Sequence, residues 1–123
     1  MEIYEDNNSS TYQITHYDTD TITINDTAYG HSLIVSANHF IPDWPVQTPK
    51  QLSLDSLTPA MIQNPETLLI GIDHCEPDFE LLNACRNEDI PLEWMNLGAA
   101  CRTFSILSAE GRHVVACLIL PAQ

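Results

Sequence analysis

The first half of the chain alternates between apolar and polar positions, a pattern typical of strands that bury one face. Residues 12–16 and 21–25 both follow this alternation, and residues 18–20 supply turn-forming side chains between them. The two runs therefore predict a β-hairpin with one solvent-exposed face. After a further reversal, residues 31–36 predict a third strand.

The second half contains longer apolar runs. Residues 67–72 and 114–120 are continuously apolar, which predicts strands buried on both faces. Residues 92–95 predict a shorter strand. Between these strands, Pro77 opens a predicted helix that ends near Asn87 and carries acidic residues in its first turn, where the helix dipole favours anions.

The last predicted helix, residues 97–110, has clear boundaries. Asn96 is a suitable N-cap and Gly111 a suitable residue just past the C-terminal end. Apolar residues at helical spacing form one stripe along it, namely Leu97, Ala100, Cys101, Phe104 and Leu107. Because strands and helices alternate through this half, the sequence predicts an α/β fold.

The segments outside these elements are also informative. Residues 40–59 contain four prolines, which predicts a long connection without regular structure, from which Trp44 packs onto the domain. A short helix is expected from Thr58, as its cap, to Asn64. The polar and acidic residues 1–10 predict a flexible tail before a single domain at residues 11–123.

Charge and composition exclude several classes of partner. Seventeen acidic residues face four basic ones, for a formal net charge of −13. Nucleic-acid binding needs several cations on one face, and anionic membranes repel such a chain, so we expect neither partner. The longest apolar run, residues 114–120, is much shorter than the ~20 residues of a membrane-spanning helix. The first residues lack the basic and apolar regions of a signal peptide, so we expect a cytoplasmic protein without membrane insertion.

The cysteines and histidines suggest no metal site or cofactor. Cys75, Cys85, Cys101 and Cys117 are widely spaced and form no C-x-x-C pair, so we expect reduced thiols. Cys101 lies on the apolar helical stripe, so we expect it in the core rather than as a nucleophile. His74 next to Cys75, with Cys85 as a distant third ligand, is a poor template for zinc. Phosphate-loop, dinucleotide-binding and nucleophile-elbow motifs are absent from the sequence.

One stretch resembles a known family. Residues 95–104 read Met-Asn-Leu-Gly-Ala-Ala-Cys-Arg-Thr-Phe, and Glu-Gly-Arg and an apolar strand follow at residues 110–120. This resembles the signature of the Mth-938-like domain family, approximately Met-Asp-Thr-x-Ala-Ala-Cys-x-Thr-aromatic-Asn and then Glu-Gly-Arg. Gly71 at the end of a buried strand and Trp44 after the third strand match the family as well. The resemblance covers residues 12–120.

The resemblance implies a three-layer fold with a central mixed β-sheet flanked by helices. The family includes bacterial and archaeal proteins of unknown function and a mitochondrial assembly factor for respiratory complex I, and no enzymatic activity is established across it. The chain departs from the family pattern at three places: Asn96-Leu97 replaces Asp-Thr, Ile72-Asp73 replaces the end of Gly-Thr-Gly, and Ser105 replaces Asn. Chemistry that depends on the replaced carboxylate or hydroxyl is therefore not expected.

The best candidate site is a crevice at the carboxyl ends of two predicted strands, the one that ends at Gly71 and the one that ends at Met95. Ligands in open α/β sheets bind where such ends lie between diverging connections. Free N–H groups at the start of helix 97–110 would suit an anion, and a nearby guanidinium would add a charge-assisted contact. The candidate ligand-binding residues are Gly71, Asp73, Asn96, Leu97, Gly98 and Arg102. The alternative is that these residues only cap, pack and pair on the surface.

Two functions stay open at this point. The first is a non-enzymatic interaction or assembly protein with a protein partner, which the resemblance and the lack of a catalytic constellation favour. The second is a small-molecule or anion-binding domain, or a weak enzyme, that uses the crevice. The sequence names neither the partner nor the ligand, and it leaves the oligomeric state open.

Overall fold

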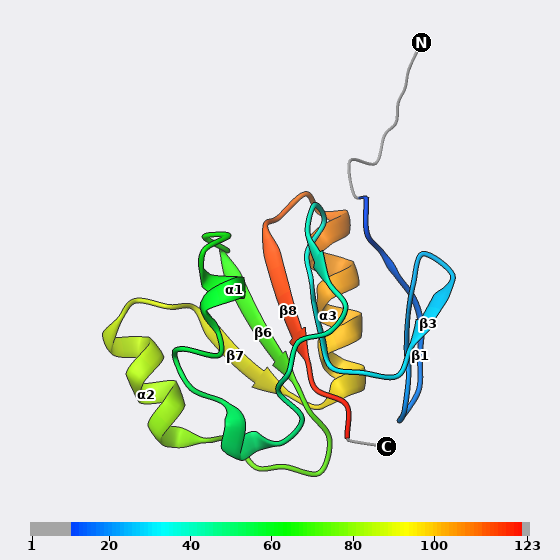
Figure 1. Ribbon diagram of the computed structural model, residues 1–123. Helices are drawn as coiled ribbons and strands as arrows, with labels where there is room; N and C mark the ends of the chain where they lie inside the picture. Colours follow the sequence, from blue (N-terminus) through cyan, green and yellow to red (C-terminus); the bar gives the residue numbers. More distant parts are fainter. Residues whose placement is uncertain (1–10, 122–123) are drawn as a thin grey trace.

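A five-stranded mixed β-sheet forms the centre of the computed structural model, which describes residues 11–121 (Figure 1). The predicted tail at residues 1–10 lies outside this range. The strand order is β5-β4-β8-β6-β7. Strands β8, β6 and β7 run parallel to one another, whereas β4 is antiparallel to both of its neighbours. In that order the strands span Phe40–Ile41, Leu33–Val35, Val114–Leu118, Thr67–Gly71 and Leu92–Met95.

The two continuous apolar runs are confirmed as central strands. Both β6 and β8 are buried at every position, because each has a strand on either side and packed layers above and below. The two-residue strand β5 was not predicted. It directly precedes Pro42 and is too short to show any alternation.

A second, three-stranded antiparallel sheet precedes the central one in the chain. It consists of β1 (Ile14–Tyr17), β2 (Ile22–Ile24) and β3 (Thr27–Tyr29). The hairpin of β1 and β2 is confirmed, but the sequence indicated only a reversal where β3 lies. Asn25 and Asp26 both adopt positive φ, 49° and 72°, which is the backbone of a two-residue turn that lets β3 pair directly with β2.

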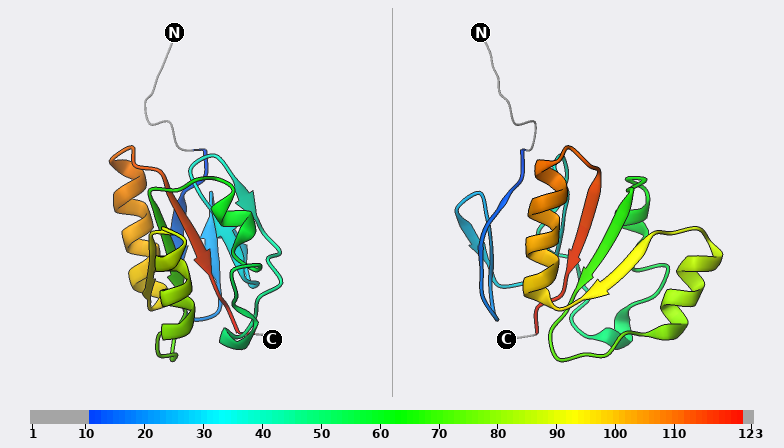
Figure 2. Two further views of the ribbon diagram at one scale, coloured as in Figure 1. Left: turned by 90° about the vertical axis from the view of Figure 1, so that its left-hand side faces the viewer. Right: turned by 180° about the vertical axis from the view of Figure 1, so that it is seen from behind.

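The helices complete three layers around the central sheet (Figure 2). Helix α3 (Leu97–Ala109) and the small sheet share one apolar cluster with one face of the central sheet. The opposite face packs against α1 (Thr58–Met61), α2 (Phe79–Asn87) and the long connection that includes a 3₁₀ helix at Pro49–Gln51. The α/β class and the three-layer arrangement are confirmed. None of the described helices is both long and apolar enough to cross a lipid bilayer.

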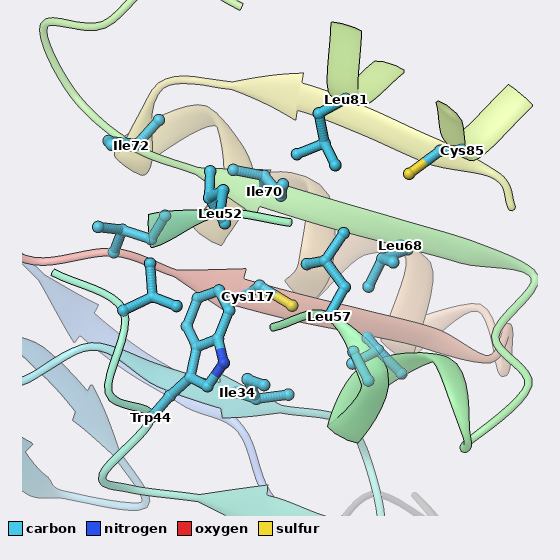
Figure 3. Packing of buried hydrophobic residues seen from close by; sticks show 14 residues of the cluster. Ile34, Trp44, Leu52, Leu57, Leu68, Ile70, Ile72, Leu81, Cys85 and Cys117 are labelled. Carbon is cyan, nitrogen blue, oxygen red and sulfur yellow. The ribbon is translucent and has the colours of Figure 1, made fainter. Parts of the chain in front are cut away.

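Trp44 fixes the long connection to the sheet. Its side chain is 2% exposed and belongs to the same apolar cluster as α1 and α2. Figure 3 shows the indole ring directed toward Ile34 and Cys117 of the sheet. The indole Nε1–H donates a hydrogen bond to the Ser56 carbonyl oxygen at 3.0 Å, so Trp44 also closes the loop between these two positions. The predicted packing of Trp44 onto the domain is therefore confirmed.

Two helices begin at positions that differ from the prediction. Helix α2 starts at Phe79 rather than at Pro77, because Asp78 acts as its N-cap and its Oδ1 accepts the Leu81 N–H at 3.1 Å. Helix α1 includes Thr58 as its first residue and ends at Met61, before Asn64. The Thr58 hydroxyl bonds back to the Leu54 carbonyl oxygen at 3.4 Å instead of capping the helix.

Helix α3 begins at the residue that the sequence indicated and ends at Ala109, one residue before the predicted end. Asn96 Oδ1 accepts the Ala99 N–H at 2.8 Å, which is the side-chain hydrogen bond of an N-cap. Gly111 has a φ of +78°, the left-handed conformation in which glycine commonly follows a helix. The buried face contains Leu97, Ala100, Cys101 and Phe104, as the apolar stripe predicted.

Replacing Asn96 with alanine is expected to lower the free energy of unfolding by about 1 kcal/mol, because the Ala99 N–H loses its acceptor. Urea denaturation followed by circular dichroism measures this change. The matched control is Ser105→Ala, which removes an exposed polar group from the same helix and leaves the cap intact. Equal midpoints for the two variants would show that the cap contributes nothing.

Candidate functional site

A cavity of about 580 Å³ opens at the carboxyl ends of β6 and β8, the edge to which their arrowheads point in Figure 1. This volume lies within the range of roughly 300–1,000 Å³ that is common for small-molecule sites. Five segments line the cavity: the β1–β2 turn at 19–20, the long connection at 47–49, the loop after β6 at 72–75, the first residue of α3, and residues 119 and 121 after β8. The cavity thus joins segments from both halves of the chain.

Asp73 connects two of these segments. Its Oδ1 accepts the Leu97 N–H at 2.9 Å, which ties the loop after β6 to the start of α3. Asn96 Oδ1 already accepts the Ala99 N–H. The amides of Leu97 and Ala99, at the helix start where the sequence predicted free N–H groups for an anion, therefore have acceptors within the chain.

Arg102 lies outside the cavity and contacts the small sheet instead. Its Nη1 donates a hydrogen bond to the Tyr17 hydroxyl at 2.6 Å, and it is not part of the cavity lining. Gly98 provides the space for this contact, since a Cβ there would lie 3.2 Å from both Arg102 Nη1 and Tyr17 Cε2. The guanidinium connects α3 to the small sheet.

Two of the six predicted site residues line the cavity and four do not. Asp73 and Leu97 line the cavity, whereas Asn96, Gly98 and Arg102 do not. Gly71 also lies outside the lining and is in close contact with α3, where a Cβ would come within 2.6 Å of the Ala100 Cβ. The lining residues from the β1–β2 turn, the long connection and the segment after β8 were missed, because no local motif marks residues that meet through tertiary packing.

Asp18 fixes the conformation of the β1–β2 turn. Its Oδ1 accepts the backbone N–H groups of Asp20 and Thr21, each at 2.9 Å, and the Thr21 hydroxyl at 3.0 Å. The hydrogen bond from the Asp20 N–H, followed by those from Thr21, lowers the pKa of Asp18. The Asp18 carboxylate is thus used to hold the turn, and this turn presents Thr19 and Asp20 to the cavity.

The cavity lining is acidic rather than basic. Asp20 and Asp73 both contribute to it, and no lysine or arginine of the described residues does. His74, at the rim, has a φ of 56°, an unusual conformation for a residue with a Cβ. No group of three or more His, Cys, Asp or Glu within residues 11–121 is placed to hold a metal ion.

The four cysteines, all within the described range, are free thiols in unequal surroundings. Cys85, Cys101 and Cys117 are buried, and burial raises the pKa of each, in the case of Cys101 to about 12. The predicted core position of Cys101 is confirmed, and Cys117 lies in the strand that was predicted to be buried on both faces. Cys75 is partly exposed, lines the cavity, and its thiol donates to the Glu76 carbonyl oxygen at 3.3 Å.

In the native chain we expect one thiol to react rapidly with 5,5′-dithiobis-(2-nitrobenzoate) at pH 8, and Cys75→Ser to remove that reaction. The three buried thiols have raised pKa values and form little thiolate at this pH, so they should react only after unfolding. The release of the coloured thiolate measures the number of reactive thiols. Cys101→Ser serves as the control, because it should leave the fast reaction unchanged.

Comparison with known proteins identifies the family. A family model described as "Protein of unknown function (DUF498/DUF598)" matches residues 14–119. A Francisella tularensis protein named "13 kDa major membrane protein" is 31% identical over 100 residues, which cover 75% of this chain and 76% of that protein.

Two solved structures extend this result. A Xanthomonas campestris protein solved by NMR has a TM-score of 0.81 and 28% identity, and the match covers 98% of this chain and 92% of that one. A Bordetella pertussis protein described as a Mth938-like domain has a TM-score of 0.74 and 25% identity, with coverage of 97% and 92%. The chain therefore belongs to the DUF498/DUF598 family of proteins of unknown function and has the Mth938-like fold.

Proposed function

We propose that this chain is a non-enzymatic binding protein that takes up a small molecule in the cavity at the carboxyl ends of β6 and β8. The observation that carries the proposal is the cavity itself, which has the volume of a small-molecule site. It lies at the edge of the parallel strands where open α/β sheets bind their ligands.

The cavity walls suit a ligand with both apolar and polar parts. Ile72, Leu97 and Ile119 are nearly fully buried, with exposed fractions of 7%, 2% and 3%, and they provide apolar lining. Thr19, Gln47 and Thr48 are exposed and provide hydrogen-bonding groups at the rim. An apolar floor with a few polar groups is the usual composition of a small-molecule pocket.

Benzyl alcohol is a suitable neutral probe for this proposal. At millimolar concentration we expect it to shift the NMR amide signals of the loop at residues 72–75 and of the connection at 47–49. Amides at the opposite edge of the sheet, where β6 and β8 begin, such as those of Gln63 and His113, should not move. If none of the cavity amides shifts, the cavity does not take up small molecules.

Alkylation of Cys75 supplies a blocking control. N-phenylmaleimide should attach to the exposed thiol, place a phenyl group in the cavity and abolish the shifts that benzyl alcohol causes. The same treatment of the Cys75→Ser variant should leave the shifts unchanged. Unaltered binding by the alkylated protein would place the benzyl alcohol site elsewhere.

A second candidate, an interaction or assembly protein, is supported by β7. This strand is the outer strand of the central sheet and pairs with β6 alone among the described strands. The Nε1–H of Trp94 on β7 is buried and has no hydrogen-bond partner among the described residues. Edge strands can pair with an extended segment of another protein. This candidate would make β7, rather than the cavity, the functional surface.

A charge reversal on the edge tests the second candidate. The exposed Glu93 of β7 is replaced with lysine, and Glu88→Lys, an exposed acid of the α2 end, is the matched control. In an affinity pull-down read by mass spectrometry, a partner protein that binds the β7 edge should be retained by the wild type and by the control. The Glu93→Lys variant should no longer retain it. A partner set that is identical for all three proteins contradicts this candidate.

For the location of the chain we infer the cytoplasm, where free thiols are stable. The four cysteines are all free thiols. The Francisella relative is named a membrane protein, but a net charge of −13 opposes contact of this chain with anionic lipid headgroups. The chain should therefore stay in the supernatant when phosphatidylglycerol vesicles are sedimented, and its appearance in the pellet would contradict this expectation.

A further inference from the structure

We infer that the ligand of this cavity is a small organic ammonium compound, with a protonated amine on a compact hydrocarbon body. The inference rests on the proposed function, because it names the chemical class of the molecule that the same cavity would bind. Two carboxylates and an apolar floor within one cavity carry it.

The two carboxylates approach the cavity from different segments. Asp73 uses Oδ1 to accept the Leu97 N–H, and no residue of the described range bonds to its second oxygen. The Asp20 carboxylate likewise has no hydrogen-bond partner among the described residues, and Asp18 fixes the turn that carries it. Both groups therefore have acceptor oxygens available for a donor that enters the cavity.

The described cations do not neutralise these carboxylates. Arg102 donates to Tyr17, Arg112 lies 3.8 Å from Glu66, and Arg86 bonds to the Asn83 side chain at 3.5 Å. Lys50 is exposed on the 3₁₀ helix and is not part of the cavity lining. The cavity therefore has a negative potential, which attracts cations and repels anions.

The apolar floor determines the rest of the ligand. Ile72, Leu97 and Ile119 offer hydrocarbon surface that a hydrated inorganic ion cannot use. An ammonium group has three donors and no acceptor, so it matches carboxylate oxygens and the hydroxyls of Thr19 and Thr48. A compact hydrocarbon body with one ammonium group uses both parts of the cavity at once.

Three probes of nearly equal shape test the inference: benzylammonium, benzyl alcohol and benzoate, titrated by NMR at pH 8. We expect benzylammonium to bind about fivefold to tenfold more tightly than benzyl alcohol, as a partly exposed ion pair allows. Benzoate should bind most weakly. Benzoate equal to or tighter than benzylammonium overturns the inference.

Charge-removing variants locate the effect. Asp20→Asn and Asp73→Asn should each weaken the binding of benzylammonium about threefold to fivefold and change the binding of benzyl alcohol less, because the alcohol carries no charge. Asparagine at position 73 retains an oxygen that can accept the Leu97 N–H, so the loop stays attached to α3. Glu88→Gln, an exposed acid outside the cavity lining, should have no effect on either probe.

The outcomes separate the two proposals. If benzyl alcohol binds in the cavity and benzylammonium binds no better, the ligand class is wrong and the proposed function stands. If benzylammonium is preferred but the preference survives both aspartate variants, the carboxylates are not its source and the inference fails. If none of the three probes shifts a cavity amide, the proposed function fails and the inference fails with it.

Discussion

Truncation of Trp44 to alanine is expected to lower the free energy of unfolding by about 3–5 kcal/mol, which is the usual cost of removing a buried tryptophan side chain. Trp44 is 2% exposed and packs in the cluster that joins the long connection to the sheet. The substitution leaves a void between these layers. It also removes the hydrogen bond from the indole N–H to the Ser56 carbonyl oxygen.

The same substitution should weaken the binding of benzyl alcohol. Trp44 anchors the segment that continues into residues 47–49, which form one wall of the cavity. Without the indole, this wall loses its fixed position relative to β6 and β8. Urea denaturation measures the change in stability, and the benzyl alcohol titration measures the change in binding.

Trp44→Phe is the matched variant. It retains an aromatic ring in the cluster but loses the indole N–H. It should therefore lower the free energy of unfolding by only about 1–2 kcal/mol, through the lost hydrogen bond and the reduced packing. If Trp44→Ala lowers the free energy of unfolding by no more than the ~1 kcal/mol typical of point mutations, Trp44 does not hold the long connection to the sheet.

Gly71→Ala is expected to destabilise the chain by about 1–3 kcal/mol, the range observed when an extra carbon is forced into a packed core. A Cβ at this position would lie 2.6 Å from the Ala100 Cβ and 2.9 Å from Leu118 Cδ2. The leucine side chain can move, but the Ala100 Cβ is fixed to the backbone of α3. The helix must therefore shift away from β6, and Leu97 in the cavity wall shifts with it.

Two further variants make this prediction specific, with thermal or urea unfolding as the measurement. Gly30→Ala introduces a methyl group whose nearest neighbour is the Asp20 carbonyl oxygen at 3.9 Å, so it should be neutral or slightly stabilising. The double variant Gly71→Ala/Ala100→Gly removes the tightest contact and should recover part of the lost stability. No recovery would mean that the approach of α3 to Gly71 is not the cause.

The elements that sequence could predict are those with local signals. Asn96 and Gly111 mark the ends of α3 through the backbone conformations that they favour, and both positions are confirmed. The continuous apolar runs predict β6 and β8 because a strand with neighbours on both sides and layers on both faces has no polar surface. Strand β3 has no buried position and β5 has only two residues, so neither produces such a pattern.

The candidate site was predicted only in part, for a different physical reason. Asp73 and Leu97 follow adjacent strands, so the order of strands and helices brings them to the same edge. The turn with Asp20 and the connection at 47–49 reach that edge through tertiary packing of Trp44 and the small sheet, which no short motif encodes. The direction of the Arg102 side chain likewise depends on Tyr17, which is 85 residues away in the chain.

The strand order has a consequence for how the chain is synthesised. Strand β8, at residues Val114–Leu118, is the last strand in sequence but lies between β4 and β6. Until β8 has emerged from the ribosome, β4 and β6 have no strand between them, and one edge of each strand stays unpaired. At the usual rate of roughly 5–20 residues per second, translation of the 78 residues that separate β4 from β8 takes several seconds. We therefore expect the central sheet to close only after β8 has been synthesised.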